Sequence, residues 1–325
     1  MSHTSAPWVV ARPTGAEERS AHPVADPALH DALARSQAGR GRLAGIVLGE
    51  RLARTRGVGG RTVSHVWADA GVAVAVVPDP DPRTQSQRRQ LLVDDCSAVR
   101  AWGERMRDLG AGLVWWPAAS PIHCIDALVD VGLRPMLRVD RPVADPAQDL
   151  TDLVVGLVDD GCDLADVVLC VPSPPVRSAP PGTVGPDAAD RFVTALVAAV
   201  PEQAGGVVVT ADPDSALVGG ADAAALARAL AGIGAPWPVG FSAGGQAIRH
   251  AASAWQLPEA AEEAPARFDA VLDRLHRARR EPLPGVVPPA VDPAIPPAVP
   301  ARGDRFDTTL LRSRSLYIAR EPGRP

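Results

Sequence analysis

The stretch PVGFSAGGQAIRHAASAW, residues 238–255, contains the unit from which the whole chain is built. Residues 238–244 form a short apolar run typical of a buried strand, and the segment after Gly245 has the composition of a helix that closes at Trp255. Gly244 and Gly245 let the backbone of the turn approach a ligand closely, and the following helix would direct free N–H groups at an anion. The turn is a candidate phosphate site, although a tight strand-to-helix connection explains the same residues.

The same strand-like pattern occurs seven more times along the chain. The runs are continuous in their apolar character, which is typical of parallel strands buried on both faces, and helical periods lie between them. Eight such units predict an α/β fold, specifically a (β/α)8 TIM barrel. An open doubly wound sheet is the alternative, but it favours fewer strands and a Gly-rich fingerprint after the first one, which the sequence lacks. The seven further runs are residues 8–12, 43–49, 72–77, 112–116, 134–140, 166–172 and 206–212.

Segments outside this pattern define the predicted domain organisation. An N-terminal extension (1–7) precedes the barrel (8–258), and a C-terminal helix (259–281) follows it with Phe268, Val271, Leu272 and Leu275 on one face. A Pro-rich linker (282–304) and an Arg-rich tail (305–325) complete the chain, because so many prolines exclude a helix and favour an extended tether.

Composition limits the classes of function. The chain is 46% hydrophobic and 22% charged, with no apolar run close to the ~18 residues that a membrane span requires, so we expect a soluble globular protein. The N-terminus has no signal-peptide pattern, and we expect a cytoplasmic location with four reduced cysteines. The net charge of −5 offers no general basic surface for nucleic acid. The chain contains no lysine, so all 33 of its Lys+Arg residues are arginines.

Several motifs resemble those of one enzyme family. FSAGGQAIRHAASAW (241–255) resembles the class I fructose-bisphosphate aldolases, whose corresponding stretch reads approximately F-S-Y-G-R-A-L-Q and reaches a tryptophan at the same spacing as Trp255. Further similarity is found in GIVLGERL (45–52), in residues 110–140, in DVVLCVPSPPV (166–176) and in RSRSLYIA (312–319). The resemblance implies a TIM barrel, a cytoplasmic glycolytic lyase that cleaves fructose 1,6-bisphosphate to two triose phosphates, and a homotetramer.

The lysines of that family are absent from the matching positions. The resemblance aligns the Schiff-base lysine with Val171, and it aligns two further active-site lysines with Trp115 and with about Val77. A class I aldolase condenses a lysine amine with the substrate ketone, and the resulting iminium accepts the electrons of the broken C–C bond. Arginine cannot replace the lysine because its guanidinium stays protonated. We therefore predict that the chain has no Schiff-base activity.

Other family positions leave a reduced set of candidate residues. Arg138 replaces the first glutamate of the family's E-P-E motif, and Asp140 keeps the acidic character of the second. Gly245 replaces the phosphate-binding arginine, so that Ser242, Gly244 and Gly245 remain as candidate phosphate ligands. Arg138 and Asp140 are either an ion pair or a site for an acidic metabolite.

Neither a metal nor a cofactor is expected. The seven histidines do not gather at the predicted strand ends, and the acidic steps at 79–81 and 212–214 are either solvated turns or cation ligands. Trp115 and Trp116 either stack on a ligand or fill the barrel mouth, and Cys170 is expected to be a small core residue.

Three functions are compatible with these residues. The first is a catalytically degenerate aldolase homologue. The second is a barrel enzyme of different chemistry that acts on a phosphorylated or acidic metabolite. The third is a structural or regulatory partner of a true aldolase. The expected partners are a small phosphorylated metabolite and copies of the same chain. Binding to nucleic acid or to a membrane is not expected.

Overall fold

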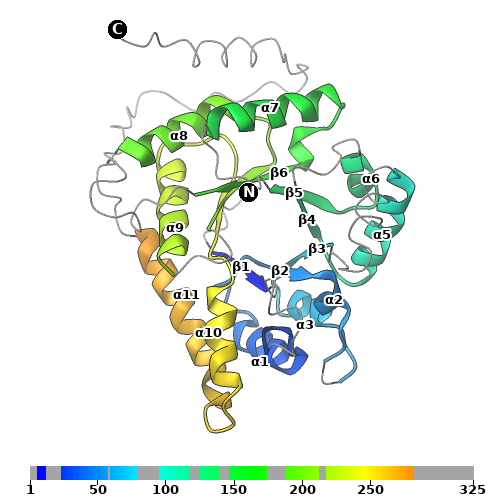
Figure 1. The fold of residues 1–325 in the computed structure, drawn as a ribbon, viewed down its shortest axis with the longest axis vertical. Helices are drawn as coiled ribbons and strands as arrows, with labels where there is room; N and C mark the ends of the chain where they lie inside the picture. The colour runs from blue at the N-terminus through cyan, green and yellow to red at the C-terminus, as the bar shows by residue number, and fades with distance from the viewer. Residues whose placement is uncertain are drawn as a thin grey trace.

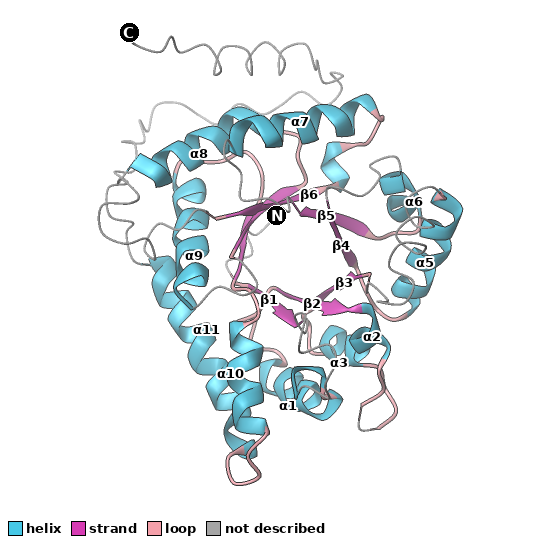
Figure 2. Ribbon diagram, viewed as in Figure 1, coloured by secondary structure: helices cyan, strands magenta, loops and turns pink. Residues whose placement is uncertain are grey.

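The computed structural model describes residues 6–11, 23–57, 59–78, 95–117, 124–138, 146–173, 187–211 and 217–280. Eight parallel strands form a closed barrel in chain order, which confirms the predicted (β/α)8 TIM-barrel fold. Figures 1 and 2 show the strands as an inner ring that is surrounded by helices. The strands are β1 (Trp8–Ala11), β2 (Gly45–Gly49), β3 (Ala73–Val77), β4 (Leu113–Pro117), β5 (Arg134–Arg138), β6 (Val168–Pro172), β7 (Gly206–Thr210) and β8 (Val239–Ser242).

Helices follow the strands and cover the outside of the ring. Two short helices follow β2, and two longer helices follow β8 (Figure 1). The helices are α1 (Pro27–Gln37), α2 (Glu50–Arg54), α3 (Val63–Asp69), α5 (Cys96–Asp108), α6 (Ile125–Asp130), α7 (Pro146–Asp159), α8 (Asp187–Ala199), α9 (Leu217–Gly232), α10 (Gln246–Trp255) and α11 (Ala264–Arg280), with 3-10 turns at Pro23–Ala25, Leu164–Asp166 and Ala261–Glu263.

The barrel closes between its first and last strands. Trp8 of β1 is in register with Ser242 of β8. Two backbone bonds complete the junction, because the Ala243 N–H donates to the Trp8 carbonyl at 2.8 Å and the Val10 N–H donates to the Gly244 carbonyl at 2.9 Å. The turn that follows β8 is therefore fixed to the start of the chain's first strand.

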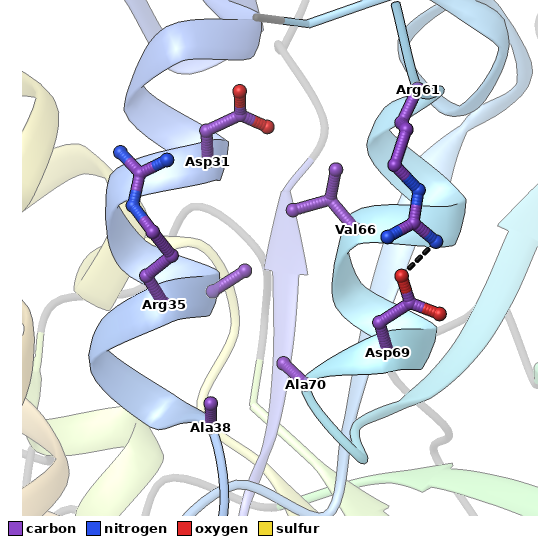
Figure 3. Close-up of a pocket in the computed structure, with 8 residues that line it drawn as sticks. Asp31, Arg35, Ala38, Arg61, Val66, Asp69 and Ala70 are labelled. Atoms are coloured by element: carbon purple, nitrogen blue, oxygen red, sulfur yellow. Dashed lines mark ion pairs between the residues drawn. The ribbon is translucent and has the colours of Figure 1, made fainter. Parts of the chain in front are cut away.

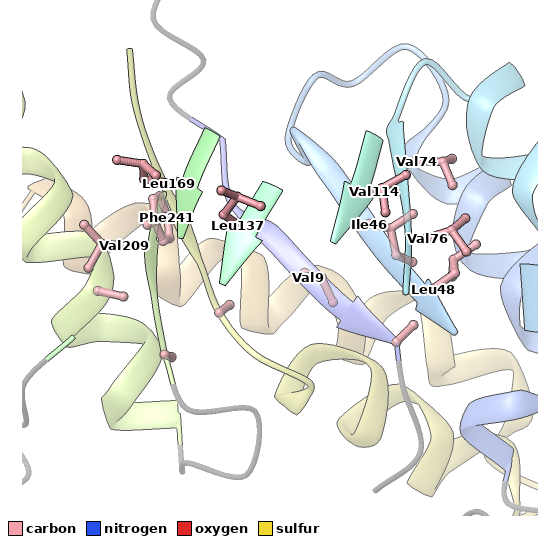
Figure 4. Close-up of a cluster of buried hydrophobic side chains, with 14 of the residues drawn as sticks. Val9, Ile46, Leu48, Val74, Val76, Val114, Leu137, Leu169, Val209 and Phe241 are labelled. Carbon is pink, nitrogen blue, oxygen red and sulfur yellow. The ribbon is translucent and has the colours of Figure 1, made fainter. Parts of the chain in front are cut away.

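Successive residues of each strand enter two different apolar layers. The larger layer lies between the strands and the helices, and it contains Val9, Ile46, Leu169, Val209 and Phe241 (Figure 4). The smaller layer fills the interior of the ring, because side chains at alternate positions of a strand point to opposite faces. This interior, called the lumen below, is lined by Trp8, Val10, Val47, Ala75, Val77, Trp115, Met136, Val168, Cys170 and Val208.

Helix α11 lies outside the regular repeat and covers α9, α10 and α1. Its four predicted contact residues, Phe268, Val271, Leu272 and Leu275, are all buried. The helix begins at Ala264, later than the sequence predicted, because Pro265 has no N–H to continue a helix that started earlier but is well suited to a first turn. The predicted linker (282–304) and tail (305–325) lie outside the described residues.

None of the helices in the described part of the chain is both long enough and apolar enough to cross a membrane.

Candidate ligand site at the barrel mouth

The carboxyl ends of the strands form the mouth of a (β/α)8 barrel, where ligands usually bind. Most of the loops on this face fall outside the described residues, and with them lie the candidate Asp140 and the acidic steps at 79–81 and 212–214. The structure places Val77, Trp115, Arg138 and Ser242 on strands that end at the mouth. It also places Gly244 and Gly245 in the turn between β8 and α10.

Two of the three positions that the motif resemblance aligns with lysines are occupied by apolar side chains in the lumen. Val77 and Trp115 both belong to the lumen layer, with exposed fractions of 6% and 5%. Trp116 points the other way, into the layer beneath the helices, where its ring lies 6.2 Å from that of Trp102. Trp115 therefore packs inside the mouth, whereas Trp116 does not fill it, so the packing interpretation of the pair holds for Trp115 alone.

Val171, which the motif resemblance aligns with the Schiff-base lysine, lies in the outer layer and is 1% exposed. Its neighbour Cys170 faces the lumen instead. The sequence alone does not reveal this because β6 is apolar at both alternating sets of positions, so that either set is compatible with the lumen.

Cys170 is a packed core residue with no solvent exposure. Burial raises the pKa of its thiol well above the ordinary value, and the positive charge of Arg138 opposes that rise. The two residues are also in register on β6 and β5. A thiol is a nucleophile only as the thiolate, so Cys170 is not poised to attack a substrate.

Arg138 supplies positive charge at the mouth. It ends β5 and is half-buried, and it follows Met136 on the face of the strand that lines the lumen. The lumen below it is otherwise apolar at the level of Cys170 and Trp115. An anionic group that entered the mouth would therefore meet a guanidinium above an apolar floor.

The turn between β8 and α10 combines a helix N-terminus with a second arginine. Gly244 adopts a positive φ of 63°, which favours glycine, and Gly245 is the N-cap of α10 without any side-chain cap. The side chain of Arg249 lies over Gly245, because a Cβ atom built on Gly245 would be only 3.0 Å from Arg249 Nη1. Arg249 was not predicted from the sequence, and it stands one helical turn after Gly245, which the motif resemblance aligns with a phosphate-binding arginine.

Ser242 is fully buried beneath this turn. Its Oγ accepts a hydrogen bond from the Gly244 N–H at 3.3 Å. Ser242 therefore shapes the turn from below and does not itself reach a ligand at the surface of the mouth.

Glu50 at the start of α2 has a structural role. Its carboxylate accepts hydrogen bonds from Trp102 Nε1 at 3.0 Å and from Arg54 Nη1 at 3.1 Å. The bond from Trp102 ties α2 to α5, whereas the bond from Arg54 lies within α2. Among the described residues, no group of three or more His, Cys, Asp or Glu side chains is arranged to hold a metal ion.

A separate pocket of about 280 Å³ lies on the outside of the barrel between α1 and α3. Figure 3 shows Asp31 and Arg35 on α1 opposite an ion pair between Arg61 and Asp69. The charges of opposite sign balance one another across this pocket. It is lined by helices and not by strand ends, so it is not part of the mouth.

Comparison with solved structures identifies similar barrels. Over 85% of this chain and 89% of the other, the structure superimposes on the fructose-bisphosphate aldolase of Plasmodium falciparum with a TM-score of 0.59 and 15% sequence identity. The likeness shows the fold. Orotidine 5'-phosphate decarboxylase of Pyrococcus horikoshii OT3 matches with a TM-score of 0.43 and 11% identity, over 84% of this chain and 99% of that one. No protein-family model matches the sequence, and no curated protein matches it either.

Proposed function

We propose that this chain is an aldolase-like barrel that binds a small phosphorylated metabolite at its mouth and does not carry out Schiff-base cleavage. The observation that carries the proposal is the lumen itself. Val77, Trp115 and Cys170 occupy it on the three strands where the motif resemblance places lysines, and each is at most 6% exposed.

Schiff-base cleavage requires an uncharged amine that can reach a bound ketone. The lumen provides apolar side chains and a protonated thiol in its place, and the sequence contains no lysine that a neighbouring position could supply. The guanidinium groups at the mouth remain protonated, so they bind anions and do not form imines.

The turn between β8 and α10 supports the binding part of the proposal. The N-cap residue Gly245 supplies no side-chain cap, and the first N–H groups of α10 carry the positive end of the helix dipole. Arg249 adds a full positive charge directly beside them, and the missing Cβ of Gly245 gives its guanidinium room to lie against the backbone. Backbone N–H groups together with a guanidinium are the usual partners of a phosphate group.

Titration calorimetry of the full chain with fructose 1,6-bisphosphate and with inorganic phosphate tests this function. We expect the sugar phosphate to bind, and Arg249→Met to weaken it by about tenfold because one charge-assisted contact is lost. Arg228→Met on the neighbouring helix α9 is the matched control, since Arg228 is exposed and its loss should change the affinity by less than about twofold.

Equal affinity of the Arg249→Met and Arg228→Met variants for the sugar phosphate would contradict the proposed anion site. Aldol cleavage by the wild-type chain would overturn the catalytic part of the proposal independently of the binding result.

A further inference from the structure

The opposite end of the barrel contains a second pocket that the proposed function does not use. It has a volume of about 360 Å³ and lies among the first residues of β1 and of β4 to β8. This volume falls within the lower part of the range found for small-molecule sites. Its walls are formed largely by lumen side chains, among them Trp8, Met136, Val168 and Val208.

Glycines at the strand starts leave the space open. Gly206 and Gly240 line the pocket on the neighbouring strands β7 and β8, where other residue types would place a side chain. The indole of Trp8 bounds the space from β1 and lies across Gly45, because a Cβ atom on Gly45 would be 2.2 Å from the Trp8 ring. A Cβ atom on Gly240 would meet Val208 Cγ2 at 3.3 Å and Trp8 Nε1 at 3.9 Å. A single added methyl group would therefore occupy part of the pocket.

One cationic side chain borders this apolar space. Arg134 Nη2 donates to the backbone carbonyls of Ala165 at 2.8 Å and of Gly205 at 2.9 Å, which fixes the guanidinium at the pocket rim. No carboxylate in the described part of the chain forms an ion pair with Arg134, and its Nε and Nη1 atoms make no hydrogen bond there. A partly buried cation without an acidic partner favours the entry of an anion.

Trp8 adds a second donor. Its side chain is 9% exposed, and within the described ranges its Nε1–H has no hydrogen-bond acceptor. This N–H lies beside Gly240, which lines the pocket. The N–H is not fully buried, so a ligand with an acceptor oxygen in the pocket can reach it.

We propose that this pocket binds a small organic carboxylate with an apolar body. The carboxylate accepts from Arg134 and Trp8, and the body packs against Met136, Val168 and Val208. A phosphate ester suits the pocket less well, because one guanidinium among apolar walls cannot compensate the desolvation of two charges. The site lies at the other end of the barrel from the mouth and does not depend on the function proposed for the mouth.

Calorimetric titration of the full chain with phenylacetate tests the proposal, with phenylacetamide as the neutral compound of the same shape. We expect phenylacetate to bind about tenfold more tightly than phenylacetamide, because only the carboxylate pairs with Arg134. Gly240→Ala should weaken phenylacetate binding by about tenfold by filling the space, and Arg134→Met should weaken it by about the same factor. Gly112→Ala is the control, since a Cβ atom there has no neighbour within 4 Å.

The absence of any heat of binding with phenylacetate up to about 10 mM, a concentration far above the dissociation constant expected of a built site, would overturn the proposal. Equal binding of the acid and the amide, or unchanged binding in Gly240→Ala, would also overturn it. If Arg134→Met does not fold, the Gly240→Ala variant decides the matter alone. Arg249→Met should leave phenylacetate binding unchanged, because Arg249 lies at the mouth and not at this pocket. A loss of binding in that variant would place the carboxylate at the mouth and would also overturn the proposal.

Discussion

Replacing Asp26 by alanine removes two hydrogen bonds, one that caps α1 and one that joins the start of α1 to the end of α10. Asp26 Oδ1 accepts from the Ala28 N–H at 2.9 Å and caps α1, and Oδ2 accepts from Trp255 Nε1 at 2.7 Å. The lost cap costs about 1 kcal/mol, and a hydrogen bond to a charged group contributes about 1.5–3 kcal/mol. Trp255 is half-buried, so the lower part of that range applies. We expect Asp26→Ala to lower the free energy of unfolding by about 2–3 kcal/mol.

Urea unfolding followed by circular dichroism measures this loss. Asp26→Ala, Trp255→Phe and the double variant form a cycle, whose coupling energy should be about 1–2 kcal/mol because the two residues contact each other directly. Asp130→Ala is the control, since its ion pair with Arg100 is exposed and should contribute less than about 1 kcal/mol. A coupling energy near zero would show that the bond between α1 and α10 does not contribute to stability.

Three further predictions concern single residues. His30 is fully buried and burial lowers its pKa, so below about pH 6.5 the unfolded chain takes up a proton that the folded chain does not. The free energy of unfolding should therefore fall as the pH drops below about 6.5. Urea unfolding at several pH values should show a weaker pH dependence in His30→Gln. Gly45→Ala should lower the melting temperature strongly, by overpacking that costs about 3 kcal/mol or more, because its Cβ would overlap an indole ring, whereas Gly112→Ala should not. In a native thiol titration with Ellman's reagent Cys96, which is half-buried, should react, while Cys170 should react only after unfolding; fast labelling of Cys170 would contradict its buried position.

Most of the barrel could be predicted from the sequence because each strand is a short, continuous apolar run. Strand β8 was expected over 238–244 and forms over Val239–Ser242, and the other runs are equally close. The same continuity conceals which residues face the lumen. On β6 both Cys170 and Val171 are apolar and buried, so hydrophobicity could not choose between them, and only the strand's orientation in the closed ring does.

The candidate site was harder to predict for a related reason. Gly244 and Gly245 were found because glycines mark turns, and their positions at the N-terminus of α10 agree with that signal. Arg249 was missed because its side chain returns along the helix to the turn it follows. A residue four positions after a helix N-cap lies on the same side of the helix as the N-cap, so this spacing could have identified Arg249.

The pocket at the opposite end had no sequence signal at all. It is lined by glycines of β7 and β8, and Gly240 of β8 lies against the indole of Trp8 on the neighbouring strand β1. These residues are far apart in sequence, and only closure of the barrel brings them together.

Aldol cleavage of fructose 1,6-bisphosphate by the purified chain, measured as triose phosphate release with and without a divalent metal ion, tests the proposed loss of Schiff-base chemistry most directly. We expect no release under either condition while the sugar phosphate still binds. Release without added metal, or a substrate adduct trapped by borohydride on a residue of the barrel, would contradict the claim that the lumen of Val77, Trp115 and Cys170 has no Schiff-base chemistry. Release only with added metal would show that a metal-dependent lyase reaction takes place in this barrel.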